Sequence, residues 1–482
     1  MKKFFLFTVC IVFLGSALQS CEDIDDNPVA SSLEVKDFIW KGLNLYYFWQ
    51  ADEENLADTR FATQRDLNVF LDSYESPEVL FEDLLVPRTT DRFSVIYNDY
   101  EVLEGLLQGT AKNNGMDYGL RRKDGSATEI YGWVRYVLPN SDAANKNVQR
   151  GMLFYAINGT SLTTENFRGL LNSDSYTINL ANFEGGAIVP NGETIALTKS
   201  TFSENPVYII DVVEIDNKKI GYLMYNGFFA NFESQLNQAF AQLKSEGITH
   251  LVLDLRYNSG GSVDTAARLA SMITGQFGNQ VFSKQQWNQK VEDFFNETDP
   301  EALLNRFTNT IGNGNAIQSL NLNKVYILTT GSSASASELV INGLKPYIQV
   351  VQIGTTTVGK NVGSITLYDS PTFAKTNVNS SHRYAMQPIV LRITDKNGNG
   401  DYINGIEPLV EQAENMDNLG VLGNQTEPLF NTAIQFILEN GRMGGRFTER
   451  EQLNFTDRKG MQPFGNEMYL DKVPAGLHLL VQ

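Results

Sequence analysis

The sequence contains few of the residues that most often carry metal or imidazole chemistry. Its 482 residues include 2 cysteines and 3 histidines, too few for a disulfide framework or a structural zinc site. Basic residues are also scarce, with 38 lysines and arginines against 56 aspartates and glutamates and a net charge of −18. Such a chain has too little positive charge to neutralise phosphates. We therefore expect no metal and no nucleic-acid partner.

The bulk composition is typical of a globular protein. Hydrophobic residues make up 42% of the chain and charged residues 20%, which excludes both a disordered chain and a bundle of membrane spans. At roughly 150 residues per domain, the length predicts about three domains.

The N-terminus has the features of a bacterial export signal. Two lysines precede an apolar stretch from Phe4 to Leu18, which is too short to cross a bilayer. The stretch ends in the sequence LQSC, which resembles a lipobox, where a cysteine is lipidated and becomes the new N-terminus. This interpretation makes residues 1–20 a lipoprotein signal peptide and Cys21 the lipidated residue. An ordinary signal peptide cleaved nearby is the alternative.

An acidic run follows Cys21 within residues 21–32. It resembles the surface-export signal of lipoproteins from Bacteroidetes-type bacteria, and a solvated tether is the alternative. We therefore expect a cell-envelope protein that is held by a lipid anchor alone, at the periplasmic or surface face of the outer membrane.

The remaining chain divides into regions of different pattern. Apolar residues recur at three- and four-residue steps within about 33–108, which predicts an N-terminal helical region. Residues 109–200 contain short strands and tight turns. Residues 201–440 alternate between strands and helices, so we predict a multidomain α/β fold with its core there. Residues 441–482 form a C-terminal tail to which we assign no role.

A pattern within 109–200 resembles a PDZ domain of the bacterial protease type. An alternating strand from Tyr131 to Val137 is followed by a proline turn, a short helical stretch and the sequence INGT. Met152 stands where that pattern usually has an aspartate. The resemblance implies a loop whose backbone amides receive a peptide carboxylate, and a small β domain without peptide binding is the alternative. The implied peptide-binding residues are Tyr118, Gly119, Leu120 and Arg121.

Three segments of the α/β region have properties that a covalent hydrolase needs. LDLRYNSGG ends in Gly260 and Gly261, whose N–H groups can approach a ligand and stabilise an oxyanion. SSASASE places Ser335 at a strand-to-helix junction, where the helix N-terminus favours developing negative charge. A capping box with Glu338 is the alternative there. GTTTVGK ends in Lys360 within apolar, glycine-rich surroundings, which can lower the pKa of an ammonium group.

Two apparent motifs do not meet their requirements. GTTTVGK has the glycines and the lysine of a P-loop, but Asn361 replaces the Mg²⁺-binding Ser/Thr. Residues 362–367 favour a strand, where a P-loop requires a helix. The run from Asp395 to Asp401 begins like a calcium loop, but its twelfth position is Ile406 rather than glutamate, which favours a hairpin turn.

In this order, the three segments resemble the C-terminal-processing (tail-specific) serine peptidase family, which carries LDLRxNxGG, SASASE and GxxxxGK. The resemblance covers about Thr90 to Glu411. It implies a crotonase/ClpP-like ββα catalytic core with an inserted PDZ-like β domain, with Ser335 as nucleophile and Lys360 as general base. The implied oxyanion donors are Gly260 or Gly261, together with Ala336.

The third catalytic position departs from the family pattern. Some members have a glutamine four residues past the lysine, where this chain has Ser364. Others have an aspartate eleven residues past the nucleophile, where this chain has Pro346. Ser364 could accept a hydrogen bond from the lysine, so we expect it to orient Lys360. A lysine base also suits the shortage of histidine, since only His382 lies in a segment suited to replace it.

These features predict a serine endopeptidase of the cell envelope that needs no cofactor. It would capture protein or peptide substrates with accessible C-termini and cleave them through an acyl-enzyme. A catalytically inactive peptide- or ligand-binding lipoprotein on the same fold is the main alternative, and a hydrolase or hydratase acting on a small acyl substrate is another. The sequence does not indicate the oligomeric state.

Overall fold

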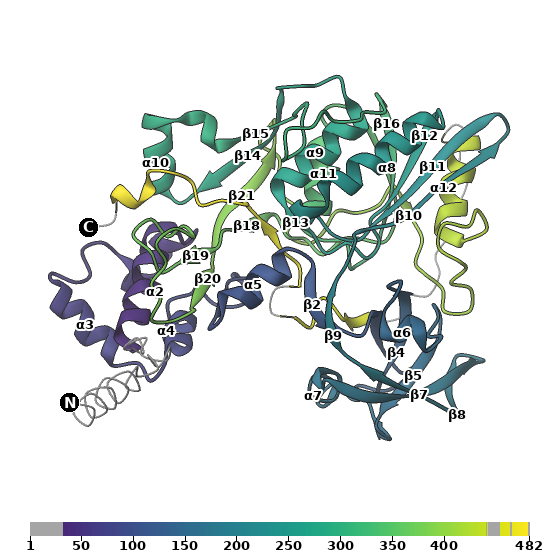
Figure 1. Ribbon diagram of the computed structural model, residues 1–482, viewed down its shortest axis with the longest axis horizontal. Helices are drawn as coiled ribbons and strands as arrows, with labels where there is room; N and C mark the ends of the chain where they lie inside the picture. The colour runs from purple at the N-terminus through teal and green to yellow at the C-terminus, as the bar shows by residue number, and fades with distance from the viewer. Residues whose placement is uncertain (1–31, 440, 442–453, 463–464, 481–482) are drawn as a thin grey trace, which may run out of the picture.

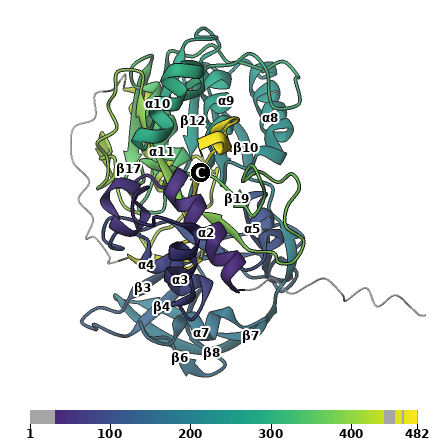
Figure 2. The same cartoon turned by 90° about the vertical axis from the view of Figure 1, so that its left-hand side faces the viewer.

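The computed structural model describes residues 32–439, 441, 454–462 and 465–480. The expected signal peptide, Cys21 and the acidic run lie outside these residues. The described chain has the mixed α/β, multidomain fold that the sequence predicts. No helix in these ranges is long and apolar enough to cross a membrane. Figure 2 shows the α/β core above the β domain, with the N-terminal lobe facing the viewer.

The N-terminal lobe is helical and packs against the core. Helix α4 begins at Pro77, because the Ser76 side chain accepts a hydrogen bond from Val79 N and proline suits the first turn. A three-stranded sheet in the order β1-β20-β19 joins this lobe to the core. The elements are α2 (Ser32–Tyr46), α3 (Gln64–Asp72), α4 (Pro77–Asp83), β1 (Val95–Tyr97), α5 (Tyr100–Leu107), β19 (Leu367–Tyr368) and β20 (Ala385–Gln387).

The β domain is inserted between the N-terminal lobe and the core (Figure 1). The chain enters it through β2 (Thr110–Asn113) and leaves through β9 (Ser200–Ser203), which pair with each other. Its sheet has the order β23-β3-β4-β5-β7-β8, with β6 beside β5. The elements are β3 (Met116–Arg122), β4 (Ile130–Val137), α6 (Asp142–Asn145), β5 (Leu153–Ile157), β6 (Thr160–Ser161), α7 (Phe167–Asn172), β7 (Ser175–Glu184), β8 (Ala187–Thr198) and β23 (Asn454–Asp457).

A six-stranded sheet in the order β10-β11-β12-β16-β17-β22 forms the core, and β11 to β22 run parallel. Helices α8, α9 and α11 pack on one face and α12 on the other. The elements are β10 (Val207–Ile215), β11 (Lys218–Tyr225), α8 (Glu233–Ser245), β12 (His250–Asp254), α9 (Val263–Thr274), β16 (Lys324–Thr329), α11 (Ala336–Leu344), β17 (Gln349–Gly354), β22 (Val410–Glu411) and α12 (Pro428–Leu438).

A second six-stranded sheet has the order β13-β24-β18-β21-β14-β15. Its strand β24 comes from near the end of the sequence and lies between β13 and β18, parallel to both. The elements are β13 (Gly261–Ser262), β14 (Val281–Trp287), α10 (Gln289–Thr298), β15 (Leu304–Arg306), β18 (Val362–Ser364), β21 (Ile389–Asp395) and β24 (Met468–Tyr469).

Residues 454–480, here named the C-terminal segment, contact all three parts of the molecule. In Figure 1 this segment is yellow and runs from the β domain past β13 and β18 to a position beside α10. Its strand β23 belongs to the β-domain sheet and its strand β24 to the second core sheet.

The structure agrees with the sequence for the segment after Lys360, whereas the segment after Asp395 forms a turn but no hairpin, because the next strand, β22, pairs with β17 and not with β21. Lys360 is followed by strand β18 rather than by a helix. Past β21, Gly398 N donates to Asp395 O and Asp395 N donates to Asn399 O, which closes a turn. The Asp395 carboxylate accepts hydrogen bonds from Asn397 N and Asn399 N within that turn.

A buried ion network lies beneath the LDLRYNSGG segment. The fully buried Arg256 guanidinium contacts Asp254 at 2.8 Å and Glu427 at 2.7 Å. Glu414 accepts hydrogen bonds from Arg150 at 2.8 Å and from Arg256 at 3.3 Å. Burial raises the pKa of Glu414, but Arg150 and Arg256 outweigh it and hold the pKa at about 2. The network joins the end of β12 to the start of α12.

We expect Glu414 to contribute to stability only above acidic pH. A carboxyl whose pKa is lower in the folded chain stabilises it above the unfolded pKa of about 4.5, and this contribution is lost as pH falls toward 2. Glu414→Gln should therefore lower the free energy of unfolding by on the order of 3 kcal/mol at pH 7. Thermal unfolding from pH 2.5 to pH 7 measures the difference, which should shrink as pH falls. A pH-independent difference would contradict the expectation.

Candidate active site

The three sequence segments meet at one edge of the core sheet. Strands β12, β16 and β17 are adjacent and parallel, so the loops after them begin at the same edge. These loops carry Gly260 and Gly261, Ser335, and Lys360 respectively. The topology therefore brings together residues that are up to a hundred positions apart in the sequence.

Ser335 has a strained backbone and a free hydroxyl. Its φ of 65° lies in the left-handed region, which a residue with a side chain rarely adopts. The side chain is completely buried, and its Oγ has no hydrogen-bond partner in the described structure. Ser335 directly precedes α11, so Ala336 N is the first N–H of the helix and has no intrahelical acceptor.

Lys360 is completely buried, with its Nζ 4.3 Å from the centre of the Phe93 ring. Its Nζ donates a hydrogen bond to Glu467 Oε2 at 2.8 Å. Burial lowers the pKa of Lys360, and the charge of Glu467 opposes this shift. Burial likewise raises the pKa of Glu467, and Lys360 opposes it. Both shifts favour the neutral forms of the two groups.

The carboxylate of Glu338 ties the serine turn to the lysine turn. Its Oε2 accepts from Ser335 N at 2.7 Å and from Lys360 N at 2.9 Å. Its Oε1 accepts from Gly359 N at 2.7 Å and from the Thr357 hydroxyl at 2.5 Å. One hydrogen bond of the capping box is therefore present, from Ser335 N to the Glu338 carboxylate. Ser335 Oγ has no hydrogen-bond partner in the described structure.

The two glycines have different roles at the site. Gly260 N donates to Asn258 Oδ1 at 2.9 Å, whereas Gly261 N donates to the carbonyl oxygen of Glu467 at 2.5 Å. Both have φ above 100°, and a side chain on Gly261 would lie 2.3 Å from Phe228 O. Gly261 is therefore the glycine whose N–H faces a peptide carbonyl.

Glu467 lies close to both Ser335 and Lys360. If Gly260 carried a methyl group, its carbon would lie 2.3 Å from Glu467 O and 3.0 Å from Ser335 Oγ. Glu467 O and Ser335 Oγ are therefore separated by no more than the sum of these two distances. The carboxylate of the same residue contacts Lys360.

Comparisons with known proteins find two matching regions in this chain. The profile of peptidase family S41 matches residues 219–387, and that of the S41 N-terminal domain matches residues 34–95. A Bacteroides fragilis protein classed with the S41 proteases has a crystal structure that matches 84% of this chain and 98% of its own, with 27% identity and a TM-score of 0.64. The chain therefore contains an S41 peptidase domain, preceded by an S41 N-terminal domain.

The curated S41 relatives are matched over part of their length. A CtpA-like serine protease of Staphylococcus epidermidis is 32% identical over 31% of this chain and 27% of its own length. The chloroplastic C-terminal processing peptidase of Tetradesmus obliquus is 23% identical over 54% of each chain. The chain thus spans between about a quarter and about half of these relatives.

Two sequence expectations for this S41 chain need correction. Ser364 does not bond Lys360 directly in the described structure. Its Oγ accepts from Gln387 Nε2 at 3.0 Å and lies 3.3 Å from Glu467 Oε2, because the carboxylate occupies the position beside the lysine. Residues 118–120 form the middle of strand β3 rather than a loop, because they pair with β4 and β23.

Sequence patterns missed two residues of the site. Phe93 comes from the N-terminal lobe, where Arg92 also donates to Gly359 O. Glu467 comes from the tail to which the sequence assigned no role. Neither lies in a periodic or glycine-rich pattern near the three motifs, so no local signal pointed to them.

We expect Glu338→Gln to destabilise the protein by about 2–4 kcal/mol. The substituted amide oxygen can serve only two of the four donors, and its NH₂ group would face the other two. Glu101, in the first turn of α5, has a side chain that is 60% exposed, so Glu101→Gln should change stability by less than about 1 kcal/mol. Chemical denaturation measures both changes. Equal effects of the two substitutions would show that Glu338 does not hold the turns.

Proposed function

We propose that the chain is a serine endopeptidase that cleaves peptide bonds in protein substrates with a Ser335–Lys360 dyad. The observation that carries the proposal is the buried, unpartnered Ser335 Oγ at the start of α11. A buried polar atom without a partner calls for an explanation, and a catalytic role is one. The S41 peptidase domain supports the same activity.

In the proposed reaction, neutral Lys360 takes the proton from Ser335 Oγ as this oxygen attacks the scissile carbonyl carbon. The low pKa that burial imposes on Lys360 makes its neutral form accessible. The lysine then gives the proton to the leaving amine, and the acyl-enzyme forms. A water molecule attacks the acyl carbon and gives a proton to Lys360. The lysine returns this proton to Ser335 Oγ as the bond from Oγ to the acyl carbon breaks, which releases the acid and restores the free serine.

The oxyanion of each tetrahedral intermediate would accept hydrogen bonds from Gly261 N and Ala336 N. The Gly261 donor already holds a peptide carbonyl, that of Glu467. The two N–H groups are held by rigid backbone, so they need not reorganise as negative charge develops. Gly260 is less suited, because its N–H is bonded to Asn258.

The β domain would bind an extended part of the substrate. Strand β3 supports this role because one of its edges pairs with β23, a strand that comes from outside the continuous β-domain sequence. Tyr118, Gly119, Leu120 and Arg121 would then contribute a strand edge rather than a carboxylate loop. Together with an acylated Cys21, this arrangement would place a PDZ-like peptidase in the cell envelope, with protein tails as substrates.

We expect Ser335→Ala and Lys360→Ala each to reduce cleavage of an unfolded protein substrate by at least about a thousand-fold. Ser337→Ala is the matched control, because this neighbouring serine is also buried but donates to Asn258 O at 3.0 Å. The control should keep most of the activity. Product fragments are identified by mass spectrometry after long incubation. Cleavage by the Ser335 and Lys360 variants at the parent rate would overturn the dyad.

Lipidation is tested separately in living bacteria. Metabolic labelling with a fatty-acid analogue should mark the parent chain, whereas Cys21→Ala should abolish the label because no other residue supplies the modified thiol. Cys10→Ala is the control and should keep the label, since Cys10 lies within the expected signal peptide. A label that persists in Cys21→Ala would exclude this anchor.

A further inference from the structure

The C-terminal segment occupies the edge of the β domain that the proposed function assigns to substrates. Its strand β23 pairs antiparallel with β3, with Thr456 opposite Leu120 and Asp457 opposite Gly119. The Phe455 ring packs edge-on against Phe167 of α7 at 5.4 Å. The segment therefore lies between a strand and a helix, as an added peptide strand would.

Charged residues then fasten the segment to the core. Asp457 accepts hydrogen bonds from Arg135 at 2.9 Å and from the Ser332 hydroxyl at 2.6 Å. Lys459 Nζ donates to the carbonyl oxygens of Asn226 and Tyr257, at 2.7 and 3.0 Å. These contacts direct the chain from the β domain toward the catalytic residues.

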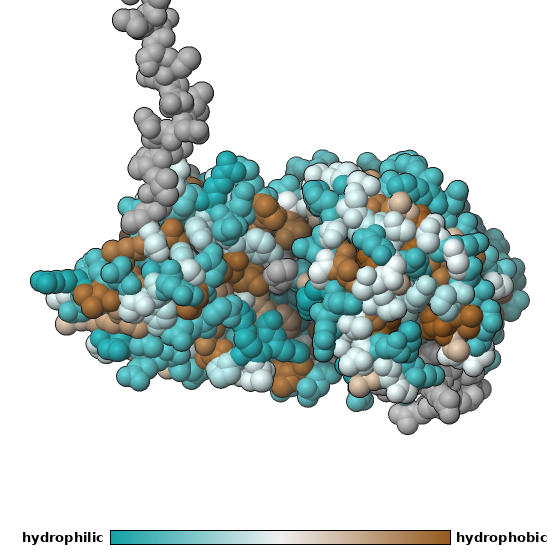
Figure 3. Space-filling model, turned by 90° about the horizontal axis from the view of Figure 1, so that it is seen from below, coloured by the Kyte–Doolittle hydropathy of each residue, from teal (hydrophilic) through white to brown (hydrophobic). Residues whose placement is uncertain are grey.

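The same segment next passes between the two strands that flank the catalytic residues. Gly261 N donates to Glu467 O at 2.5 Å, and Leu470 N donates to Ser364 O at 3.1 Å. Strand β24 thus completes the sheet between β13 and β18. Seen from below, the surface is hollowed between the N-terminal lobe and the β domain (Figure 3). A cavity of about 670 Å³ lies between the N-terminal lobe and the core, lined by α5, β19, Ala230, Asn231 and residues 469–473.

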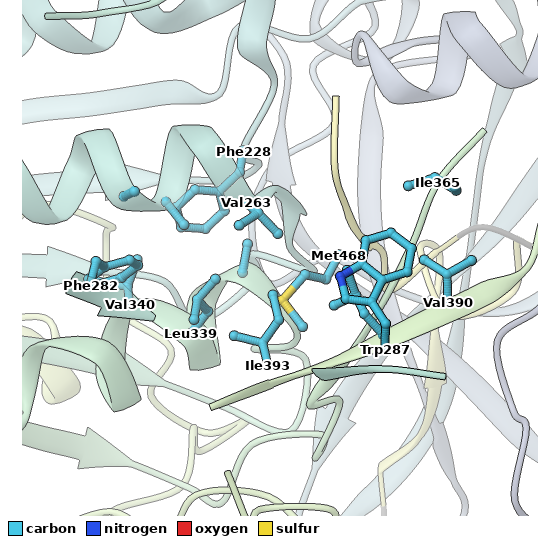
Figure 4. Close-up of a cluster of buried hydrophobic side chains, with 14 of the residues drawn as sticks. Phe228, Val263, Phe282, Trp287, Leu339, Val340, Ile365, Val390, Ile393 and Met468 are labelled. Atoms are coloured by element: carbon cyan, nitrogen blue, oxygen red, sulfur yellow. The ribbon is translucent and has the colours of Figure 1, made fainter. Parts of the chain in front are cut away.

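Side chains of β24 anchor it from both sides. Met468 is fully buried, and Figure 4 shows its side chain among Trp287, Ile393 and Leu339. The Tyr469 hydroxyl donates to Leu107 O of α5 at 2.8 Å. A fully buried methionine stabilises the docked strand by about 1.5–3 kcal/mol.

Glu467 occupies the nitrogen that would have to accept the proton of Ser335 in the proposed dyad. Its carboxylate holds Lys360 Nζ at 2.8 Å, and Ser335 Oγ has no partner in the described structure. While this contact lasts, Nζ is not free to accept the serine proton. At the same time the Glu467 carbonyl occupies the Gly261 donor.

We propose that residues 454–480 are an internal pseudosubstrate that fills both peptide-binding surfaces and holds Lys360 away from Ser335 through Glu467. This inference rests on the proposed function, because filling the cleft inhibits cleavage only if the dyad cleaves. External peptides must displace this segment before they are cut.

The pseudosubstrate role differs from one in which Glu467 positions Lys360 for catalysis. If Glu467 blocks the base, Glu467→Gln should raise kcat/KM by at least about ten-fold and extend activity to lower pH, because the lysine loses a charge that favours its protonated form. If Glu467 positions the base, the same substitution should lower kcat. A lower kcat would overturn the proposal.

Docking is tested in the full chain with Met468→Asp, which would place a charge in the apolar core, and with Leu479→Asp as control. Leu479 lies in the same segment and is 73% exposed. In a Ser335→Ala background, hydrogen exchange at Gly261 and Leu470 should speed up at least about ten-fold for Met468→Asp and stay unchanged for the control. With Ser335 intact, cleavage of an unfolded protein should rise by a similar factor in Met468→Asp alone.

A synthetic peptide of residues 454–480 tests whether the Met468→Asp chain is still folded and able to bind this segment. Added to the Met468→Asp chain, this peptide should restore inhibition and amide protection. It should act at a concentration at least about ten-fold lower than a peptide of residues 465–480, because the longer peptide binds both surfaces. Failure of the longer peptide to bind, or equal potency of the two, would overturn the proposal. If the peptide protects the amides but no variant shows Ser335-dependent cleavage, the proposed function fails while the segment remains a ligand of both surfaces.

Discussion

The structure of the catalytic edge depends on one buried carboxylate. Glu338 accepts two backbone N–H groups from the lysine turn, one from the serine turn and one hydroxyl. Burial raises the pKa of this carboxyl, and the hydrogen bonds oppose that shift. Four donors on two oxygens tie the two turns together, in addition to a backbone hydrogen bond from Val358 N to Ser333 O at 3.0 Å. The strained conformation of Ser335 persists because its N–H is held in this way.

The surrounding sheets present open strand edges that need a partner. An unpaired edge exposes N–H and C=O groups and invites association with other chains. Here β23 covers the edge of β3, and β24 joins β13 to β18. Both covering strands come from the C-terminal segment, so the chain pairs these strand edges with its own residues.

The electrostatics of the site follow from the burial of its charged side chains. Lys360, Glu467 and Glu338 are all buried, and each is shifted toward its neutral form. An ammonium group in such surroundings can become a base only when no carboxylate competes for its proton. In the proposed mechanism, the same low polarity that would suit Lys360 to act as a base would also make its contact with Glu467 inhibitory.

Local patterns in the sequence were sufficient for the core elements and for three parts of the site. The apolar strands and the glycine and serine turns after them are encoded by neighbouring residues, so β12, β16 and β17 and the loops that carry Gly261, Ser335 and Lys360 could be read from the chain itself. Parallel pairing then places these loops together.

Contacts across long sequence distances were decided only by the tertiary structure. Glu467 lies 107 residues beyond Lys360, and neither its neighbours nor its spacing distinguish it from a surface glutamate. Its partner, its burial and the shift of its pKa arise from the sheet pairing that draws β24 between β13 and β18. Sequence determined which residues could act as nucleophile and base, and the fold alone determined that a carboxylate from the far end of the chain would contact Lys360, because long-range strand pairing has no local signature.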